Sequence, residues 1–360
     1  MISAEGSPAR VEAAVQALQR RFPPDTGMQY TFVREGQEPL AVCRGLADRG
    51  RAEPVTPRTT FHCLSTTKPI TALAVLRLVA RGQVELDAPL ARYVEGLPYP
   101  SGATVRQVLS HQAGLPNPLP LAWVHRDAEH ATFDGAAFLA RILREHPKAK
   151  PPGRKAAYSN IGYLLLGRLI ELVSGVPYAE FVQREILSAI PQADDGYLGF
   201  DLPAGRHAVG YTPQLSALGL FLALLPDPAR LREREGVYIR YRPFHLDGAA
   251  YGGLKGNALG WLPLLQAIAR RDERLLPAPL YDSWFATQAL ASGAPSGVAL
   301  AWFTGQLGGY RFVCHAGGGP GYGSEIRVYP ELHAASVLML NTTLVRDTRS
   351  LDVADVHVLT

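Results

Sequence analysis

Strand-like runs near both ends of this 360-residue chain, with a helical middle, are the feature that most constrains its fold. Alternating or apolar short runs occur at residues 29–33, 40–44, 298–304, 311–315, 324–329 and 336–340. Residues 11–20 and most of 66–190 carry helical periodicity instead. We therefore predict an α+β (or α/β) fold in which both chain ends build one antiparallel sheet flanked by helices. The predicted sheet-containing lobe is 1–65 and 251–360, the mainly helical lobe is 66–250, and a cleft lies between them.

A serine and a lysine lie three residues apart at the predicted start of a helix. From residue 70 the apolar positions recur at helical period until Gly82, a suitable C-cap. Residues three apart share a helix face, so the amine of Lys68 can reach the hydroxyl of Ser65. The free N–H groups of a first turn also favour a developing oxyanion. The pair predicts an activated serine nucleophile; the alternative is a helix-capping serine followed by a surface lysine.

Two later stretches supply further polar groups. Tyr158 and Asn160 stand two apart, just before a helical run predicted at 164–173. In an extended segment such side chains point to the same side, so both can face one cleft. Residues 313–321 read as a strand that ends in a glycine-rich turn, where the backbone can pass close to a bound acyl group.

In this order, the motifs STTK (65–68), YSN (158–160) and HAG (315–317) resemble those of the serine β-lactamase and penicillin-binding protein superfamily. The resemblance is to its class C-like branch, which also holds esterases and D-amino-acid peptidases. Segments 104–116 and 162–168 resemble the framework of the same family. The similarity runs from about residue 10 to residue 343 and is weakest between 190 and 250. It implies a β-lactamase-like fold.

The resemblance also implies a role for each motif residue. Ser65 would attack the substrate carbonyl, and Lys68, in a partly desolvated site, would help to remove its proton. Tyr158 would act as a second base, as tyrosinate or through Lys68, and would protonate the leaving group. Asn160 would donate to the acyl side chain or hold Lys68. The backbone N–H groups of Ser65 and Gly318 would form the oxyanion hole.

The third motif departs from the β-lactamase pattern, because many relatives have Lys-Thr-Gly where this chain has His315, Ala316 and Gly317. A lysine there can hold a substrate carboxylate, whereas a histidine is mostly neutral at pH 7. Some peptidases of the family also carry histidine at this place. We favour a carboxylesterase that acts on short acyl esters through a Ser65 acyl-enzyme. The alternatives are a D-amino-acid peptidase, amidase or β-lactamase with the same residues, and a non-catalytic binding protein. His315 itself can also be read as a strand histidine bonded within the sheet.

Composition and missing motifs argue against other classes. The formal net charge of +4 comes from scattered arginines and does not indicate nucleic-acid binding, and no apolar run suggests a membrane span. Residues 1–10 lack the features of a signal peptide, so a cytoplasmic location is expected. We expect no cofactor and no metal, because His-Glu-x-x-His, paired cysteines and phosphate-loop spacings are missing. The absence of Gly-x-Ser-x-Gly argues against an α/β-hydrolase. The expected partner is a small ester or amide, and Cys63 and Cys314 are expected to be buried thiols.

Two segments are harder to interpret. Residues 215–225 are strongly apolar and could form a core helix, a lid or a partner surface, with core the commonest outcome. As a lid, this run would set the size of the acyl or alcohol pocket together with Trp123, Tyr251 and Trp302, which are more often packing residues. The tail from 347 to 360 shows little helical periodicity and is expected to be short, irregular or part of a dimer contact.

Overall fold

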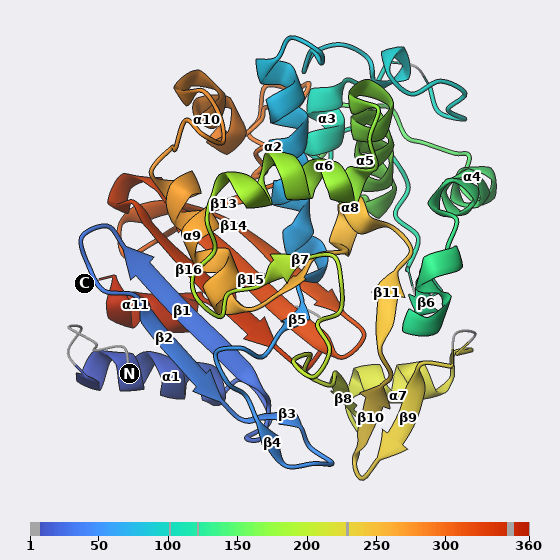
Figure 1. Cartoon of the computed structure of the whole chain (residues 1–360). Helices are drawn as coiled ribbons and strands as arrows, with labels where there is room; N and C mark the ends of the chain where they lie inside the picture. Colours follow the sequence, from blue (N-terminus) through green and yellow to red (C-terminus); the bar gives the residue numbers. More distant parts are fainter. Residues whose placement is uncertain (1–7, 101, 121, 228–229, 344–348, 360) are drawn as a thin grey trace.

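A six-stranded antiparallel sheet forms the centre of the fold (Figure 1). The computed structural model describes residues 8–100, 102–120, 122–227, 230–343 and 349–359. In spatial order the strands are β13 (Phe303–Leu307), β14 (Tyr310–Gly319), β15 (Tyr322–Tyr329), β16 (Ala334–Leu340), β1 (Met28–Arg34) and β2 (Leu40–Arg44). The first and last parts of the chain meet where β1 pairs with β16, with Met28 opposite Leu340. The prediction of one sheet built from both ends is confirmed.

One predicted strand was misplaced. The run 298–304 was expected to be extended throughout, but β13 begins only at Phe303. Ala299 N–H donates to the Trp302 carbonyl at 2.7 Å, and Ala301 has a left-handed φ of 70°. The apolar run therefore folds back in a tight turn before the strand starts, and its residues are buried as part of the core.

Helices cover both faces of the sheet, which explains why every residue of β15 and β16 is buried. On one face α1 (Pro8–Gln19) and α11 (Asp352–Val358) share an apolar cluster with strand side chains such as Tyr30 and Leu338. On the other face α9 (Ala258–Ala269) packs against β16 and β1. Both chain ends therefore contribute to the cover as well as to the sheet.

Helix α11 corrects the expectation of an irregular tail for its described residues, 349–359. Its inner face carries a buried carboxylate beside apolar residues such as Leu351 and Ala354. The side chain of Asp355 is fully buried and accepts hydrogen bonds from Tyr30 Oη (2.9 Å), Tyr329 Oη (2.7 Å) and Ser336 Oγ (2.7 Å). Arg327, also buried, faces it from β15 and pairs with Glu325 at 2.7 Å. A helix that docks through a polar network shows little hydrophobic periodicity in its sequence.

The central part of the chain supplies most of the helices. They are α2 (Thr67–Ala80), α3 (Val105–Leu109), α4 (Gly135–Glu145), α5 (Asn160–Ser174), α6 (Tyr178–Glu185) and α8 (Ala249–Gly252), with α10 (Ala278–Phe285) following α9. Short 3-10 turns are η1 (Leu64–Thr66), η2 (Leu90–Arg92), η3 (Asp127–Thr132), η4 (Leu187–Ala189) and η5 (Pro330–Leu332). Among the described residues no single helix is long and apolar enough to cross a membrane, although α5 with Tyr178–Ala189 passes that test as a pair bent by 74°.

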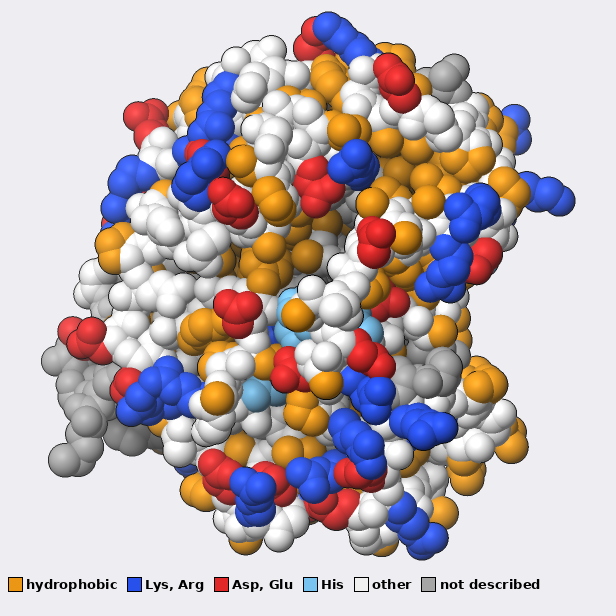
Figure 2. Space-filling view, turned by 45° about the vertical axis from the view of Figure 1, so that its right-hand side comes forward, with side chains coloured by type: hydrophobic (Ala, Val, Ile, Leu, Met, Phe, Trp, Pro, Cys, Tyr) orange, Lys and Arg blue, Asp and Glu red, His pale blue; other side chains and the backbone are white. Residues whose placement is uncertain are grey.

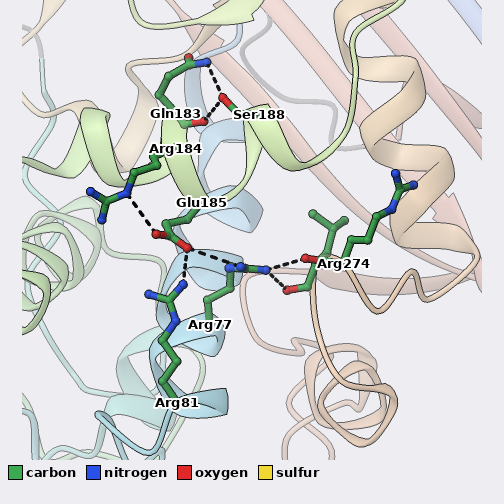
Figure 3. Close-up of polar contacts among 8 residues, drawn as sticks. Arg77, Arg81, Gln183, Arg184, Glu185, Ser188 and Arg274 are labelled. Carbon is green, nitrogen blue, oxygen red and sulfur yellow. Dashed lines mark hydrogen bonds and ion pairs between the residues drawn. The ribbon is translucent and has the colours of Figure 1, made fainter.

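The buried helix α2 is fixed at its far end by a carboxylate on α6 (Figure 3). The Glu185 carboxylate accepts hydrogen bonds from Arg77 at 3.4 Å, from Arg184 at 3.1 Å and, in a closer contact, from Arg81. Arg77 also donates to the carbonyl of Arg274 at 2.7 Å. These contacts tie α2 to α6 and to the segment after α9, so the helix that carries Lys68 has a fixed direction.

The remaining short strands pair in smaller sheets outside the central one. They are β3 (Leu46–Asp48) with β4 (Glu53–Pro54), β5 (Phe61–His62) with β12 (Lys255–Gly256) and β7 (Leu198–Gly199), β6 (Val124–Arg126) with β11 (Phe244–Leu246), and β8 (Tyr211–Pro213) with β10 (Tyr238–Tyr241) and β9 (Arg232–Glu235). The predicted lobe boundaries, 65/66 and 250/251, stay a prediction.

Helix α7 (Ala217–Ala223) lies beside β8 to β10 and corrects the expectation of a core helix at 215–225. Only Gly219 and Leu222 of this helix are buried. Leu215 and Leu224 are each 85% exposed. By contrast Trp123, Tyr251 and Trp302 are buried packing residues, as predicted.

Candidate active site

Ser65 lies in the 3-10 turn η1, directly before α2, where the chain is held in an unusual conformation. Leu64 has a φ of 53°, a left-handed value that a branched side chain seldom adopts. The turn is anchored at the preceding carbonyl, that of Cys63, which accepts from Thr66 Oγ1 at 2.7 Å and from Ser324 Oγ at 2.6 Å. Neighbouring contacts thus maintain local strain of the kind found at functional sites. Ser65 remains partly exposed, whereas its neighbours Leu64 and Thr66 are buried.

Lys68 is buried in the first turn of α2, where the predicted contact with Ser65 is present. Its Nζ lies 3.0 Å from Ser65 Oγ and donates to the backbone carbonyl of Tyr251 at 2.7 Å. Burial holds the pKa of Lys68 well below its usual value, which favours the neutral amine. A neutral amine has a lone pair with which to accept the serine proton. Sequence reasoning missed the role of Tyr251, because a backbone carbonyl leaves no signal in the side chains.

Tyr158 lies on the open side of the serine. Its phenol is hydrogen-bonded to the Ser65 side chain, and the Lys68 Nζ lies 4.9 Å from the centre of its ring. Burial raises the pKa of Tyr158, an effect that the bond to Ser65 only partly offsets. The resting side chain is therefore a phenol with a proton to give, and a resting tyrosinate, one of the two forms expected from the sequence, is disfavoured.

His111 is a second residue that sequence reasoning did not single out. Its ring lies 4.4 Å from that of Tyr158, and its Nδ1 accepts from the backbone N–H of Ser159 at 3.2 Å. Burial, and the nearby Lys68, hold the pKa of His111 well below its usual value, so the imidazole is neutral. The residue has a left-handed φ of 58°. It supports the segment that presents Tyr158; the only sequence signal was its position in the 104–116 framework.

Asn160 is the first residue of α5, four residues earlier than the predicted helix start. The helix begins here because Ser159 Oγ accepts from the N–H of Gly162 at 3.1 Å and caps it. The buried Asn160 Oδ1 has no hydrogen-bond partner within the described part of the chain. Such an orphaned acceptor in a buried site needs an explanation, and a bound substrate or water supplies one.

Strand β14 brings the third motif against the serine turn. A Cβ atom placed on Gly317 would lie 2.5 Å from the Cys63 carbonyl oxygen and 2.9 Å from the Ser65 nitrogen, so only glycine fits. The next residue, Gly318, is exposed. The glycines stand within the strand, whose last residue is Gly319, rather than in the turn that was predicted. The strand backbone therefore lies alongside the Ser65 amide, as an oxyanion pair requires.

His315 is 1% exposed and its Nδ1 lies 2.8 Å from the Ala316 carbonyl oxygen. Burial lowers the pKa of His315 to about 3. The imidazole is accordingly neutral at pH 7, and it lies in the strand as the alternative interpretation held. It supplies no permanent charge to a substrate.

Histidine side chains are visible near the middle of the face shown in Figure 2, between an apolar region and mixed basic and acidic side chains. His125 Nδ1 lies 2.7 Å from Asp247 Oδ1, and its Nε2 lies 2.9 Å from His130 Nδ1. His245 stacks on His130 with ring centres 3.6 Å apart and lies 3.0 Å from Lys255 Nζ. Across the described residues, no three His, Cys, Asp or Glu side chains are grouped so as to hold a metal ion. These rings join β6, η3 and β11.

Comparison with known proteins assigns the chain to a family. The family described as "Beta-lactamase" matches residues 9–359. Esterase EstB of Burkholderia gladioli is 30% identical over 308 residues, which cover 76% of this chain and 73% of the esterase. Penicillin-binding protein 4* of Bacillus subtilis (strain 168) is 26% identical over 304 residues, covering 82% of this chain and 64% of that protein.

Among solved structures, D-amino acid amidase from Ochrobactrum anthropi SV3 complexed with D-phenylalanine has a similar fold, with a TM-score of 0.78 and 21% identity. The match covers 97% of this chain and 98% of the amidase. The similarity in sequence spans almost all of the described residues, and the fold is the same. The chain belongs to the β-lactamase family of serine hydrolases.

Proposed function

We propose that this protein is a carboxylesterase that hydrolyses short acyl esters through an acyl-enzyme on Ser65. One observation carries the proposal: a buried Lys68, whose pKa burial holds well below its usual value, lies 3.0 Å from the hydroxyl of a partly exposed serine at the start of a helix. This is the arrangement in which a serine hydroxyl becomes a nucleophile.

In acylation, Ser65 Oγ bonds to the ester carbonyl carbon as its proton passes to the amine of Lys68. The carbonyl oxygen gains the negative charge, which the N–H groups of Ser65 and Gly318 would stabilise, each donor being worth about 3 kcal/mol. The C–O bond to the alcohol then breaks. Tyr158 gives its proton to the leaving oxygen and recovers one from the Lys68 ammonium.

In deacylation, water attacks the acyl carbon and its proton passes through Tyr158 to Lys68. The bond to Ser65 Oγ breaks, Oγ takes back a proton, and the carboxylic acid leaves. Each step uses groups that the fold already holds together, so little reorganisation is needed.

Ester substrates are favoured over acids and peptide C-termini by the neutral state of His315. Without a fixed cation at this point, a substrate carboxylate would lose its usual partner. The similarity to an esterase supports the same choice. The second candidate, hydrolysis of D-amino-acid amides or β-lactams, is supported by the fold shared with D-amino acid amidase and by the relative that is a penicillin-binding protein.

The test is a kinetic comparison of the wild type and Ser65→Ala on p-nitrophenyl butyrate, nitrocefin and a D-alanyl amide. We expect kcat/KM of the wild type to be highest for the ester by at least about a hundredfold, and the variant to be inactive. Faster turnover of the amide or lactam would replace the proposal with the second candidate. No turnover of any of them, together with no phosphonate labelling of Ser65, would indicate a binding protein.

A further inference from the structure

An apolar cavity of about 260 Å³ opens beside the C-terminal end of β14. Gly318, Gly319 and Pro320 form one side of it. Leucine and proline side chains form most of the rest, among them Leu119 before β6 and Leu222 on α7. The cavity therefore begins at the residue whose N–H is proposed to hold the oxyanion.

The position of the cavity along β14 separates it from the part of the site where the leaving group would lie. Tyr158, which would protonate the leaving oxygen, lies near His315 and Phe303, with ring centres 6.1 Å and 6.5 Å away. Gly317, two residues further along, packs on the Ser65 nitrogen, and the cavity follows from Gly318 onward. Since Ser65 stands between the two, an ester with its alcohol at Tyr158 directs its acyl chain toward the cavity.

The cavity offers no free charge, although Asp227 and Arg232 are in its wall. Their side chains lie 3.6 Å apart. Arg232 also donates to the Leu225 carbonyl at 2.7 Å and to that of Leu222, while Asp227 accepts from the backbone N–H of Leu231 at 3.1 Å. Both charges are thus satisfied within the protein and join α7 to β9. A charged acyl group would be desolvated here without a partner.

Helix α7 contributes two leucines to this wall, Leu218 and the more deeply buried Leu222. Leu222 is 8% exposed and lines the cavity, whereas Leu224 is 85% exposed and does not. Leu222, on the helix, can therefore contact a chain in the cavity, whereas Leu224, the residue directly after the helix, cannot.

We propose that this cavity binds the uncharged aliphatic chain of the acyl group, and that Leu222 limits the length of that chain. The inference rests on the proposed esterase function and specifies its substrate class as neutral esters of linear aliphatic acids. A water molecule occupies about 30 Å³ in the liquid, so a cavity of about 260 Å³ has room for on the order of eight groups of that size. Each methylene buried there should raise kcat/KM about fourfold until the cavity is full.

The experiment measures kcat/KM for p-nitrophenyl acetate, butyrate, hexanoate and octanoate with wild type, Leu222→Trp and the matched control Leu224→Trp. Thermal unfolding verifies that each variant is folded. We expect the hexanoate-to-acetate ratio to exceed about ten in the wild type, to fall at least about tenfold in Leu222→Trp, and to stay unchanged in Leu224→Trp. A p-nitrophenyl hemisuccinate ester should be at least about tenfold poorer than the butyrate of similar length.

An unchanged ratio in a folded Leu222→Trp variant would overturn the inference while leaving the esterase proposal intact. A hemisuccinate turned over as well as butyrate would overturn the choice of a neutral chain. If Leu222→Trp instead alters selectivity among alkyl acetates that differ only in the alcohol, the acyl assignment is wrong. Loss of the proposed function would look different, because no ester would be hydrolysed in a Ser65-dependent way.

Discussion

Replacing Gly317 with alanine tests how closely β14 must approach the nucleophile. The added Cβ would lie 2.5 Å from the Cys63 carbonyl oxygen, 2.6 Å from Ser324 Oγ and 2.9 Å from the Ser65 nitrogen. Ordinary van der Waals contact begins at 3.4 Å, so strand and turn must separate by 0.9 Å at the closest point, the difference between 3.4 and 2.5. Two of the three atoms belong to the backbone and cannot rotate away.

A separation near 1 Å would pull the N–H of Gly318 away from that of Ser65. Misplacement on this scale, or loss of one oxyanion donor, lowers rates by about 10²–10³. Overpacking of this kind destabilises a fold by about 1–3 kcal/mol. We therefore expect Gly317→Ala to remain folded below its lowered midpoint of thermal unfolding, and kcat/KM for p-nitrophenyl butyrate to fall by about 10²–10³.

The assay pairs ester kinetics with thermal unfolding, at a temperature where both variants are folded. Gly135→Ala is the matched control, because its Cβ would lie 3.7 Å from a Phe133 ring carbon, in ordinary contact at the start of α4. The control should keep wild-type activity. If Gly317→Ala is folded and its kcat/KM stays within about threefold of wild type, the close approach of β14 is not needed for catalysis and the oxyanion assignment fails.

Four further outcomes are expected. Lys68→Met should lower kcat/KM by about 10²–10⁴ yet raise the midpoint of thermal unfolding. Burial lowers the pKa of Lys68, and a lysine whose pKa is lowered on folding destabilises the folded state at pH values below its unfolded pKa, pH 7 included. A midpoint below that of the wild type would contradict this. Asp355→Ala should lower the urea-unfolding free energy by about 3–5 kcal/mol, because three hydroxyl donors and an arginine lose a buried partner. Glu185→Gln should lower the unfolding free energy by about 1 kcal/mol or less and leave kcat unchanged, because the arginines that pair with Glu185 are partly solvated. A large loss of kcat would show that contacts at the far end of α2 affect catalysis at Ser65. Burial lowers the pKa of His207 to about 3 and, together with the charge of Lys255, lowers the pKa of His245 to about 4. Below pH 6.5 the unfolded chain therefore binds more protons than the folded chain, and the unfolding free energy should fall as the pH is lowered from 6.5 to 4. An unfolding free energy that does not change over this range in urea titrations would refute the prediction.

The parts of this protein that could be predicted from sequence are those governed by short-range spacing. Ser65 and Lys68 meet because positions three apart share a helix face, and the short strand-like runs 29–33 and 40–44 pair with each other as β1 and β2. The run 311–315 was predicted as a strand on the same local grounds, although the glycines that follow it continue the strand rather than form a turn. Such features need no knowledge of the rest of the chain.

The parts that could not be predicted depend on distant contacts. Helix α11 has a buried Asp355, whose three hydroxyl partners come from β1, β15 and β16. Because these partners are distant in the sequence, no local sequence pattern indicates the helix. The run 215–225 is apolar but mostly exposed, because it packs only through a narrow face on β8 and through leucines that line a cavity. The hydrogen bond from Lys68 Nζ to the Tyr251 carbonyl joins residues 183 positions apart, and its acceptor is a backbone atom.

The pairing of β1 with β16 also has a consequence for biosynthesis. During translation β1 and β2 emerge early, but β16 is made about 290 residues later, which at about 5–20 residues per second is tens of seconds. Until then, β1 has an unpaired edge that can join other strands and aggregate. The sheet can therefore close only after most of the polypeptide has left the ribosome, and that edge stays open to other strands until then.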